Sequence, residues 1–187
     1  MELSQIAADI ANALVAIDSS GVPFKTFHAG VGPYGEPQLL CLVADTLNGL
    51  DAYRGAVATT RTPDLLVKGQ WALEFKIARP FGDNGKPAEN WSVNLLHPYE
   101  GNVSAIGDCF KLLALHGPER RAVVVIGYEH SPPLIDLAPL LSAFEVVASR
   151  VAHVNLGPRF HETRYRLVHP VHQQLTVTAW EVKGRSV

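Results

Sequence analysis

Apolar side chains recur at spacings of three and four residues in several stretches of the chain. The first stretch predicts an amphipathic helix over residues 2–17, with its apolar positions at Leu3, Ile6, Ile10, Leu14 and Ile17. A second helix is predicted over residues 36–49, where Pro37 suits the first turn and Asn48–Gly49 ends it. Two more helices are predicted over residues 104–115 and 133–152.

β-Branched and alternating apolar residues predict strands in the segments between these helices. We expect a strand over residues 53–60, a hairpin over 63–78, a buried central strand over 120–129, and one or two strands between 163 and 182. Residues 79–91 form a long loop rich in turn residues, a kind of loop that often carries function. This order of elements predicts a mixed α/β fold, and the absence of any repeat or linker predicts one domain over residues 1–187.

The hairpin places charges where its apolar pattern does not need them. Centring the turn on Gly69 pairs Val67 with Trp71 and Leu65 with Leu73, and it sets Asp64 opposite Glu74. One face is then apolar, with Leu65, Val67, Trp71, Leu73, Phe75 and Ile77. The other face carries Asp64, Glu74 and Lys76.

Two interpretations of this charged face stay open. It can be an ordinary solvated surface on which Lys76 balances a carboxylate. However, two carboxylates opposite each other repel and destabilise the strand pair. A divalent cation between them would reverse that interaction, and Mg²⁺ prefers such oxygen ligands. Fold stability gives no separate reason for an amine at Lys76.

Composition narrows the choice of function. The 187 residues are 47% hydrophobic and carry a formal net charge of -2, which excludes a protein that coats DNA with a broad basic surface but leaves room for a local basic cleft. Cys41 and Cys109 lie in apolar helical contexts and are expected to be buried, reduced thiols. The N-terminus lacks the pattern of a signal peptide, and no apolar run is long enough to span a membrane, so we expect a cytoplasmic protein without a membrane partner.

The hairpin also resembles a known nuclease signature. Pro63–Asp64, followed after nine residues by Glu74-Phe75-Lys76, is similar to the motif of the PD-(D/E)xK superfamily of restriction endonuclease-like nucleases. The resemblance covers about residues 34–128 and implies an α-β-β-β-α-β core with a mixed sheet flanked by helices. Residues 1–33 and 129–187 would then be extensions, an N-terminal helix and a C-terminal segment of helix and strand. No subfamily is indicated.

The resemblance implies a role for each residue of the motif. Asp64 and Glu74 would bind Mg²⁺, for which Mn²⁺ is expected to substitute, and the main-chain carbonyl of Phe75 would assist them. Lys76 would orient or deprotonate the attacking water and stabilise charge in the transition state. Glu36 resembles the extra acidic residue that many members contribute to the metal. An acidic residue in the first turn of a helix also simply complements the helix dipole.

Other charged residues are weaker candidates. Ser104, Asp108 and Lys111 form one polar stripe of a helix, which we expect to face solvent at Asp108, while Lys111 can equally lie beside the site and contact nucleic acid. Arg79 begins the long loop and can reach a phosphate. Residues 159–172 hold the one basic and aromatic cluster of the sequence, in which Arg164 and Arg166 are the predicted DNA contacts. A zinc site made from its histidines is disfavoured, because no suitable ligand spacing surrounds them.

These observations favour a Mg²⁺-dependent deoxyribonuclease that hydrolyses DNA phosphodiester bonds, with DNA as its partner and a homodimer among the open oligomeric states. The alternative is a nucleic-acid-binding or protein-interaction module in which the nuclease fold has a vestigial site. A hydrolase acting on RNA or nucleotides is a third interpretation. The complete set of Asp64, Glu74 and Lys76 favours the enzyme, whereas the acidic net charge favours the binding module.

Overall fold

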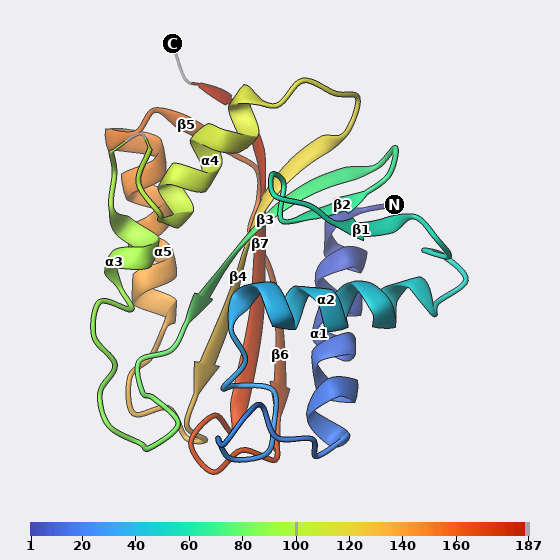
Figure 1. Ribbon diagram of the computed structural model, residues 1–187. Coiled ribbons are helices and arrows are strands. Elements are labelled where there is room, and N and C mark those ends of the chain that lie inside the picture. The colour runs from blue at the N-terminus through green and yellow to red at the C-terminus, as the bar shows by residue number, and fades with distance from the viewer. Residues whose placement is uncertain (100, 186–187) are drawn as a thin grey trace.

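A seven-stranded mixed β-sheet runs through the centre of the protein (Figure 1). The computed structural model describes residues 1–99 and 101–185. The strands are β1 (Val57–Thr59), β2 (Leu65–Val67), β3 (Trp71–Ala78), β4 (Arg120–Glu129), β5 (Val154–Leu156), β6 (Phe160–Tyr165) and β7 (Gln174–Arg185). Their order is β1-β2-β3-β4-β7-β5, and β6 also pairs with β7. β3 and β4 are parallel, and the other pairs are antiparallel.

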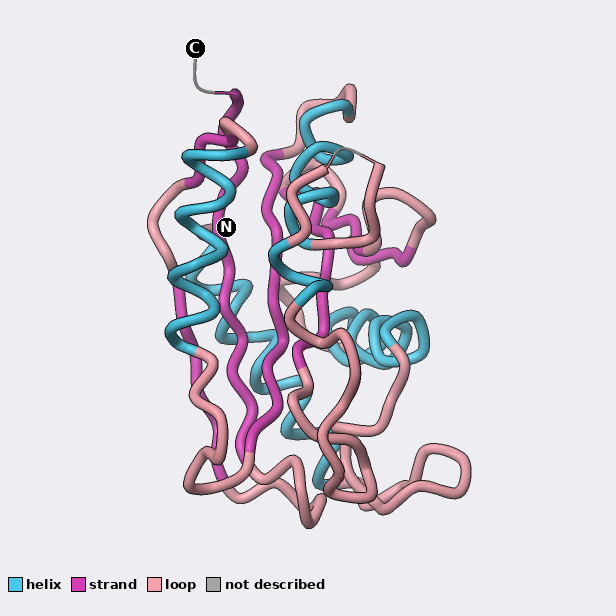
Figure 2. Tube along the Cα trace, turned by 90° about the vertical axis from the view of Figure 1, so that its left-hand side faces the viewer, coloured by secondary structure: helices cyan, strands magenta, loops and turns pink. Residues whose placement is uncertain are grey.

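Helices cover both faces of this sheet. On one face lie α1 (Leu3–Ser19) and α2 (Glu36–Asn48), and on the other lie α3 (Val93–Leu96), α4 (Ala105–Ala114) and α5 (Ala138–Val146), which continues into the π-helical turn η1 (Val147–Val151). Figure 1 shows the sheet between these two sets of helices, and Figure 2 shows the molecule from the side on which α3, α4 and α5 lie. Each face has its own hydrophobic core: α1 and α2 pack against one side of β3, β4 and β7, while α4 and α5 pack against the other.

The predicted hairpin register is confirmed. Leu65 pairs with Leu73 and Val67 pairs with Trp71. The predicted apolar face, which includes Phe75, lies in the core beneath α1 and α2, and Ile77 packs against it. The central strand also has its predicted bounds at residues 120–129, as expected for a run of β-branched residues buried on both faces.

Several predicted boundaries differ from the structure. The first strand begins only at Val57, because the amide side chain of Asn48 bonds both N–H and C=O of that residue and holds residues 51–56 in turns. The helix expected over residues 133–152 begins at Ala138. The tail contains β5 as well as β6 and β7. The short helix α3 was not expected.

The segments expected to be extensions belong to the centre of the fold. β7 pairs with β4 from Ala122 to Glu129, and α1 packs on the face of β7. The order α2-β1-β2-β3-α3-α4-β4 contains the predicted succession of elements, with α3 as an additional short helix. The mixed α/β fold, with a sheet flanked by helices, is therefore confirmed, and a restriction endonuclease-like core stays a prediction.

The two cysteines are both free thiols, as expected, but only Cys109 is buried. Cys41 is exposed on α2, because it lies on the side of that helix opposite the buried Leu39 and Val43. Within the described ranges, no helix combines the length and apolar character needed to cross a membrane.

Candidate functional site

The β2–β3 hairpin brings the three predicted side chains to one face of the sheet. Asp64 lies just before β2, and Glu74 and Lys76 occupy alternate positions of β3. Asp64 Oδ2 accepts a hydrogen bond from the backbone N–H of Phe75 at 2.8 Å, which fixes this carboxylate against β3. The hairpin register therefore determines the first half of the site.

Glu74 is the most deeply enclosed of these acids. Its exposed fraction is 1%, and its Oε1 atom has no hydrogen-bond partner among the described residues. Burial, together with the nearby charges of Asp64 and Asp108, raises the pKa of Glu74 to about 8. A buried carboxylate with an unsatisfied oxygen is costly, so the position is built for a ligand or a proton.

Lys76 lies at the centre of the group. Its Nζ atom is 2.7 Å from Asp108 Oδ2 and 3.8 Å from Glu36 Oε1, and it donates a hydrogen bond to the main-chain oxygen of Phe75 at 2.9 Å. Burial alone would lower the pKa of Lys76, but the carboxylates of Asp108 and Glu36 outweigh burial and raise it. Lys76 has 7% exposure, so its ion pair with Asp108 is shielded from solvent.

Asp108 is the site residue that sequence reasoning assigned to solvent. It is fully buried, and its two oxygens contact Lys76 at 2.7 Å and Lys111 at 2.6 Å. The stripe that it shares with Ser104 and Lys111 runs from the N-cap of α4 to its last turn, and from it Asp108 contacts Lys76 of β3. Ser104 caps this helix by accepting a hydrogen bond from the backbone N–H of Gly107. The polar stripe was the sequence feature that could have identified Asp108 as a site residue. However, a helical pattern alone does not show whether a polar face meets solvent or another element.

Glu36 approaches the same group from the start of α2. It lies in the first turn of this helix, where the helix dipole favours a negative charge. Burial raises the pKa of Glu36, the charge of Lys76 lowers it, and the charge of Asp64 raises it again. The resulting pKa is about 7. Glu36 and Asp64 both line a cavity of about 530 Å³ between the start of α2 and residues 59–61. This cavity gives the group an opening to solvent.

The assembled group contains more acids than bases. Carboxyl groups from Glu36, Asp64, Glu74 and Asp108 surround amines from Lys76 and Lys111. Four carboxylates minus two ammonium groups leaves an excess of two negative charges when all are ionised. Because Glu74 and Lys76 are buried, the interpretation as a solvated face is wrong.

The residues present fit a divalent cation of the Mg²⁺ type. Such an ion usually takes one or two protein carboxylates and keeps several waters. Asp64 and Glu74 offer these oxygens, and the unpartnered Oε1 atom of Glu74 is available to bind. The group does not form a closed cage: in the described part of the chain, the sole trio of His, Cys or carboxylate ligand atoms within 4.8 Å of one another belongs to other residues.

The raised pKa values predict how pH affects the metal-free protein. Glu36 and Glu74 titrate near 7 and 8 in the folded state but near 4.5 when unfolded, so the folded state holds protons that the unfolded state has lost. Stability conferred by this difference is present below about pH 4.5 and is lost as pH rises toward 8. In a buffer that contains a metal chelator, Glu74→Gln should reduce this loss of folding stability. Its melting temperature at high pH should be higher than that of wild type by on the order of 5 °C.

Thermal melts of wild type and Glu74→Gln between acidic and alkaline pH would measure this effect. Asp45→Asn, on the exposed side of α2, is the matched control and should run parallel to wild type. If the Glu74→Gln and wild-type melting curves keep a constant separation across the pH range, Glu74 does not titrate as described.

The predicted basic residues separate into two sets. Lys111 lies within the group, 3.7 Å from Glu74 Oε2, and Arg79 follows β3 directly. Arg164 instead lies on β6, which β4 and β7 separate from β3, at roughly 14 Å for three strand spacings. Arg164 pairs with Glu162 at 2.9 Å, and Arg166 is an exposed residue just beyond β6.

The predicted basic cluster of residues 159–172 is not a continuous basic surface. Arg159 forms a two-pronged ion pair with Glu145 at 2.7 and 2.8 Å. His169 and His172 are buried rather than surface groups, with 0% and 1% exposure. The sequence concentrates these residues, but their contacts with distant segments neutralise or cover much of the cluster.

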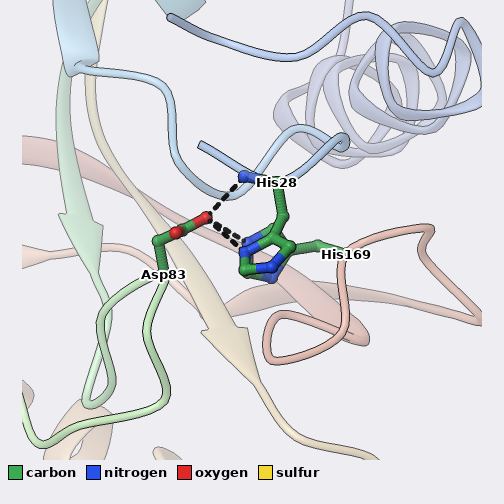
Figure 3. Close-up of side chains that lie close together, drawn as sticks. All are labelled: His28, Asp83 and His169. Atoms are coloured by element: carbon green, nitrogen blue, oxygen red, sulfur yellow. Dashed lines mark hydrogen bonds and ion pairs between the residues drawn. The ribbon is translucent and has the colours of Figure 1, made fainter. Parts of the chain in front are cut away.

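A second polar cluster joins three loops and was not expected. His28, Asp83 and His169 converge from loops far apart in the sequence (Figure 3). Asp83 Oδ1 lies 2.8 Å from the backbone N of His28, 3.1 Å from His28 Nδ1 and 2.9 Å from His169 Nε2. Burial raises the pKa of Asp83, but the hydrogen bonds from His169 and His28 outweigh it, so the pKa is lowered.

The hydrogen bonds of His169 identify this cluster as a clamp between loops. His169 Nδ1 accepts from the backbone N–H groups of Val171 and His172 at 3.1 and 3.0 Å, so Nδ1 carries a lone pair. The ring proton is then on Nε2 and is donated to Asp83. A metal bound at Nε2 would require that proton to move to Nδ1, where two N–H donors already point. These contacts of His169 are those of a hydrogen-bonded clamp, although the three ligand atoms lie within 4.8 Å of one another.

In comparisons with known proteins, no family model, curated protein or solved structure matches this chain.

Proposed function

We propose that this protein is a Mg²⁺-dependent nuclease that hydrolyses DNA phosphodiester bonds at the group formed by Asp64, Glu74 and Lys76. One observation carries the proposal: the buried Glu74 Oε1 atom has no hydrogen-bond partner in the described chain, although the charges of Asp64, Asp108 and Lys111 lie nearby. Hard oxygen ligands with excess negative charge favour a divalent cation, and an amine in the same place favours an anionic substrate. The resemblance to the PD-(D/E)xK motif supports the same conclusion.

Asp64 and Glu74 would hold the ion, with help from Glu36 and from the Phe75 carbonyl, which already points to the same side as Lys76. The bound ion would supply charge neutralisation at the phosphate and a lowered pKa for an attacking water. Lys76 would act as a cation rather than as a base, because the pKa of its amine is raised. Its positive charge would stabilise the negative charge that develops on the phosphate oxygens.

Asp108 would act through Lys76 as a positioning residue. Its carboxylate holds the Lys76 amine at 2.7 Å and the Lys111 amine at 2.6 Å, so both cations have fixed places before a substrate arrives. The cavity beside Glu36 and Asp64 would admit the phosphodiester. Preorganised charges of this kind need no rearrangement during the reaction, which is why they contribute strongly to rate.

A binding module without catalysis is the second candidate, and the same Lys76 contacts favour it. The amine already satisfies Asp108 and approaches Glu36, so the carboxylates are partly neutralised without a metal ion. Such a protein would bind nucleic acid or another protein through a vestigial site.

Metal binding separates these candidates. Mg²⁺ or Mn²⁺ should raise the melting temperature of the wild type, because a ligand that binds only the folded state stabilises it. Asp64→Asn should remove this rise without unfolding the chain, since the asparagine oxygen can still accept the Phe75 N–H bond. Asp45→Asn should keep the rise. The same three proteins should be assayed for cleavage of plasmid, linear duplex and single-stranded DNA.

A nuclease requires that wild type cuts at least one of these DNAs only when a divalent ion is present. If titration calorimetry detects no divalent-ion binding, even with DNA present, the proposed metal site is wrong, and so is the proposed nuclease function. Metal binding that disappears in Asp64→Asn, without cleavage under any divalent ion, would favour the binding module.

A further inference from the structure

A second cavity lies just past the carboxyl end of β3, where this strand runs parallel to β4. Its volume is about 330 Å³, and its walls come from residues 77–91, from the start of α3, from the 27–33 loop and from His172. Crevices at the carboxyl ends of parallel strands are common ligand sites in α/β proteins. This cavity is a neighbour of the carboxylate group, because Arg79 on its wall follows Lys76 by three residues and feels the charge of Glu36.

Aromatic side chains form much of the wall. Phe27, Phe81 and Trp91 all line the cavity, and none is fully buried; Phe27 has an exposed fraction of 40%. By contrast, Trp71 and Trp180 are completely buried in the two cores. Partly exposed aromatic rings around a small cavity can stack on a flat ring system, as they do in proteins that bind single-stranded nucleic acids.

Arg79 supplies a fixed positive charge at the edge of the cavity. Its Nη1 atom donates to the carbonyl oxygens of Gly32 and Tyr34 at 2.6 and 3.2 Å. Among the residues the structure describes, no carboxylate lies within 4.0 Å of its guanidinium, and burial lowers the pKa of Arg79. A half-buried cation with no carboxylate in direct contact is costly, and a phosphate would offset that cost.

Acidic and amide groups determine which part of a nucleotide the cavity itself can take. Asp83 and Glu89 line it together with Asn94. Carboxylates repel a phosphate but accept hydrogen bonds from the amino groups of bases. The cavity therefore suits an uncharged heterocycle, while the phosphate attached to that heterocycle lies toward Arg79.

We propose that this cavity binds one unpaired nucleobase of the substrate strand, adjacent to the phosphodiester at Glu74 and Lys76; the inference rests on the proposed nuclease function. A volume of about 330 Å³ is near the lower end of the roughly 300–1,000 Å³ of small-molecule sites, so it accommodates a single ring system and no duplex. The substrate class is then single-stranded DNA or a duplex with unpaired nucleotides at an end.

Binding of fluorescently labelled DNA, measured by anisotropy in calcium buffer with a chelator control, tests this without relying on cleavage. Three ligands of equal length should be compared: a single strand, a blunt duplex, and a strand of abasic residues that keeps its phosphates. The affinity of wild type for the ordinary single strand should be at least about 10-fold higher than its affinity for the blunt duplex or the abasic strand. This difference is in line with the stacking contribution of a base.

Trp91→Leu keeps an apolar side chain but loses the stacking surface, so it should abolish the preference for the ordinary strand over the abasic strand. Tyr165→Leu, which removes an aromatic ring with 62% exposure on β6, is the matched control and should keep the preference. Thermal melts should show that both variants fold. Competition by 5′-dAMP that depends on Trp91 would indicate that a free nucleotide suffices to occupy the cavity.

Two outcomes overturn the inference: equal affinity for ordinary and abasic strands in wild type, or a preference that survives in folded Trp91→Leu. Either outcome leaves the nuclease proposal intact if divalent ions still support DNA cleavage that depends on Asp64. Conversely, a Trp91-dependent preference for the ordinary strand over the abasic strand, without any DNA cleavage, would support the base-binding cavity and contradict the nuclease proposal.

Discussion

Replacing Lys76 by glutamine should lower the rate of DNA cleavage by about two to four orders of magnitude. The Lys76 amine lies 2.7 Å from Asp108, 3.8 Å from Glu36 and 2.9 Å from the Phe75 carbonyl, so its charge is held where the phosphate would gain negative charge. Glutamine keeps a hydrogen-bond donor but removes that charge. Single-turnover cleavage at saturating Mg²⁺ measures the loss directly.

The matched control is Lys68→Gln, an exposed lysine in the hairpin turn at the far end of β3. It should cleave at the wild-type rate. Divalent-ion binding to Lys76→Gln should persist or tighten, because a positive charge beside the carboxylates has gone. If folded Lys76→Gln cleaves DNA as fast as wild type, the motif is not the catalytic site.

Replacing Asp108 by alanine should lower the free energy of unfolding by on the order of 3–5 kcal/mol, because it leaves the buried Lys76 amine without its nearest counter-charge. The measurement should be made near pH 6, below the pKa values of about 7 and 8 for Glu36 and Glu74, so that repulsion between these glutamates and Asp108 is largely absent. Urea denaturation gives the difference, provided that the slope is unchanged.

A double-mutant cycle with Lys76→Met and Asp108→Leu would separate the ion pair from general packing effects. The double variant should be more stable than the single variant Asp108→Leu, since neither charge is left buried alone. Asp45→Asn again serves as the surface control. A loss below about 1 kcal/mol for Asp108→Ala would mean that the pair contributes no more than a typical exposed ion pair.

Local patterns were sufficient to predict the hairpin half of the site. A glycine-centred turn and alternating side chains determine both the register and the face, so Asp64, Glu74 and Lys76 were grouped correctly without knowledge of the rest of the chain. Asp108 was missed for a physical reason. Helical spacing shows that Asp108 and Lys111 share a side, but only tertiary packing decides whether that side faces solvent or β3.

The histidines show where sequence reasoning fails completely. His169 and His172 looked like members of a basic surface, but the contact of His169 with Asp83 spans 86 positions of the chain. No local pattern encodes such a contact, since the loops that meet there have no periodicity. Arg79 was identified only as a candidate for phosphate contact, and its anchoring by the carbonyls of Gly32 and Tyr34 depends on the same long-range assembly.

The position of β7 has a consequence for the biosynthesis of the protein. β4 pairs with β3 on one side and with residues 174–181 on the other, so the sheet that carries Glu74 and Lys76 stays incomplete until those residues have left the ribosome. Contacts between such distant segments form slowly, because the intervening chain must be ordered first. Whatever chemistry the site performs, a nascent chain therefore acquires it late, only after β7 has been translated and has emerged.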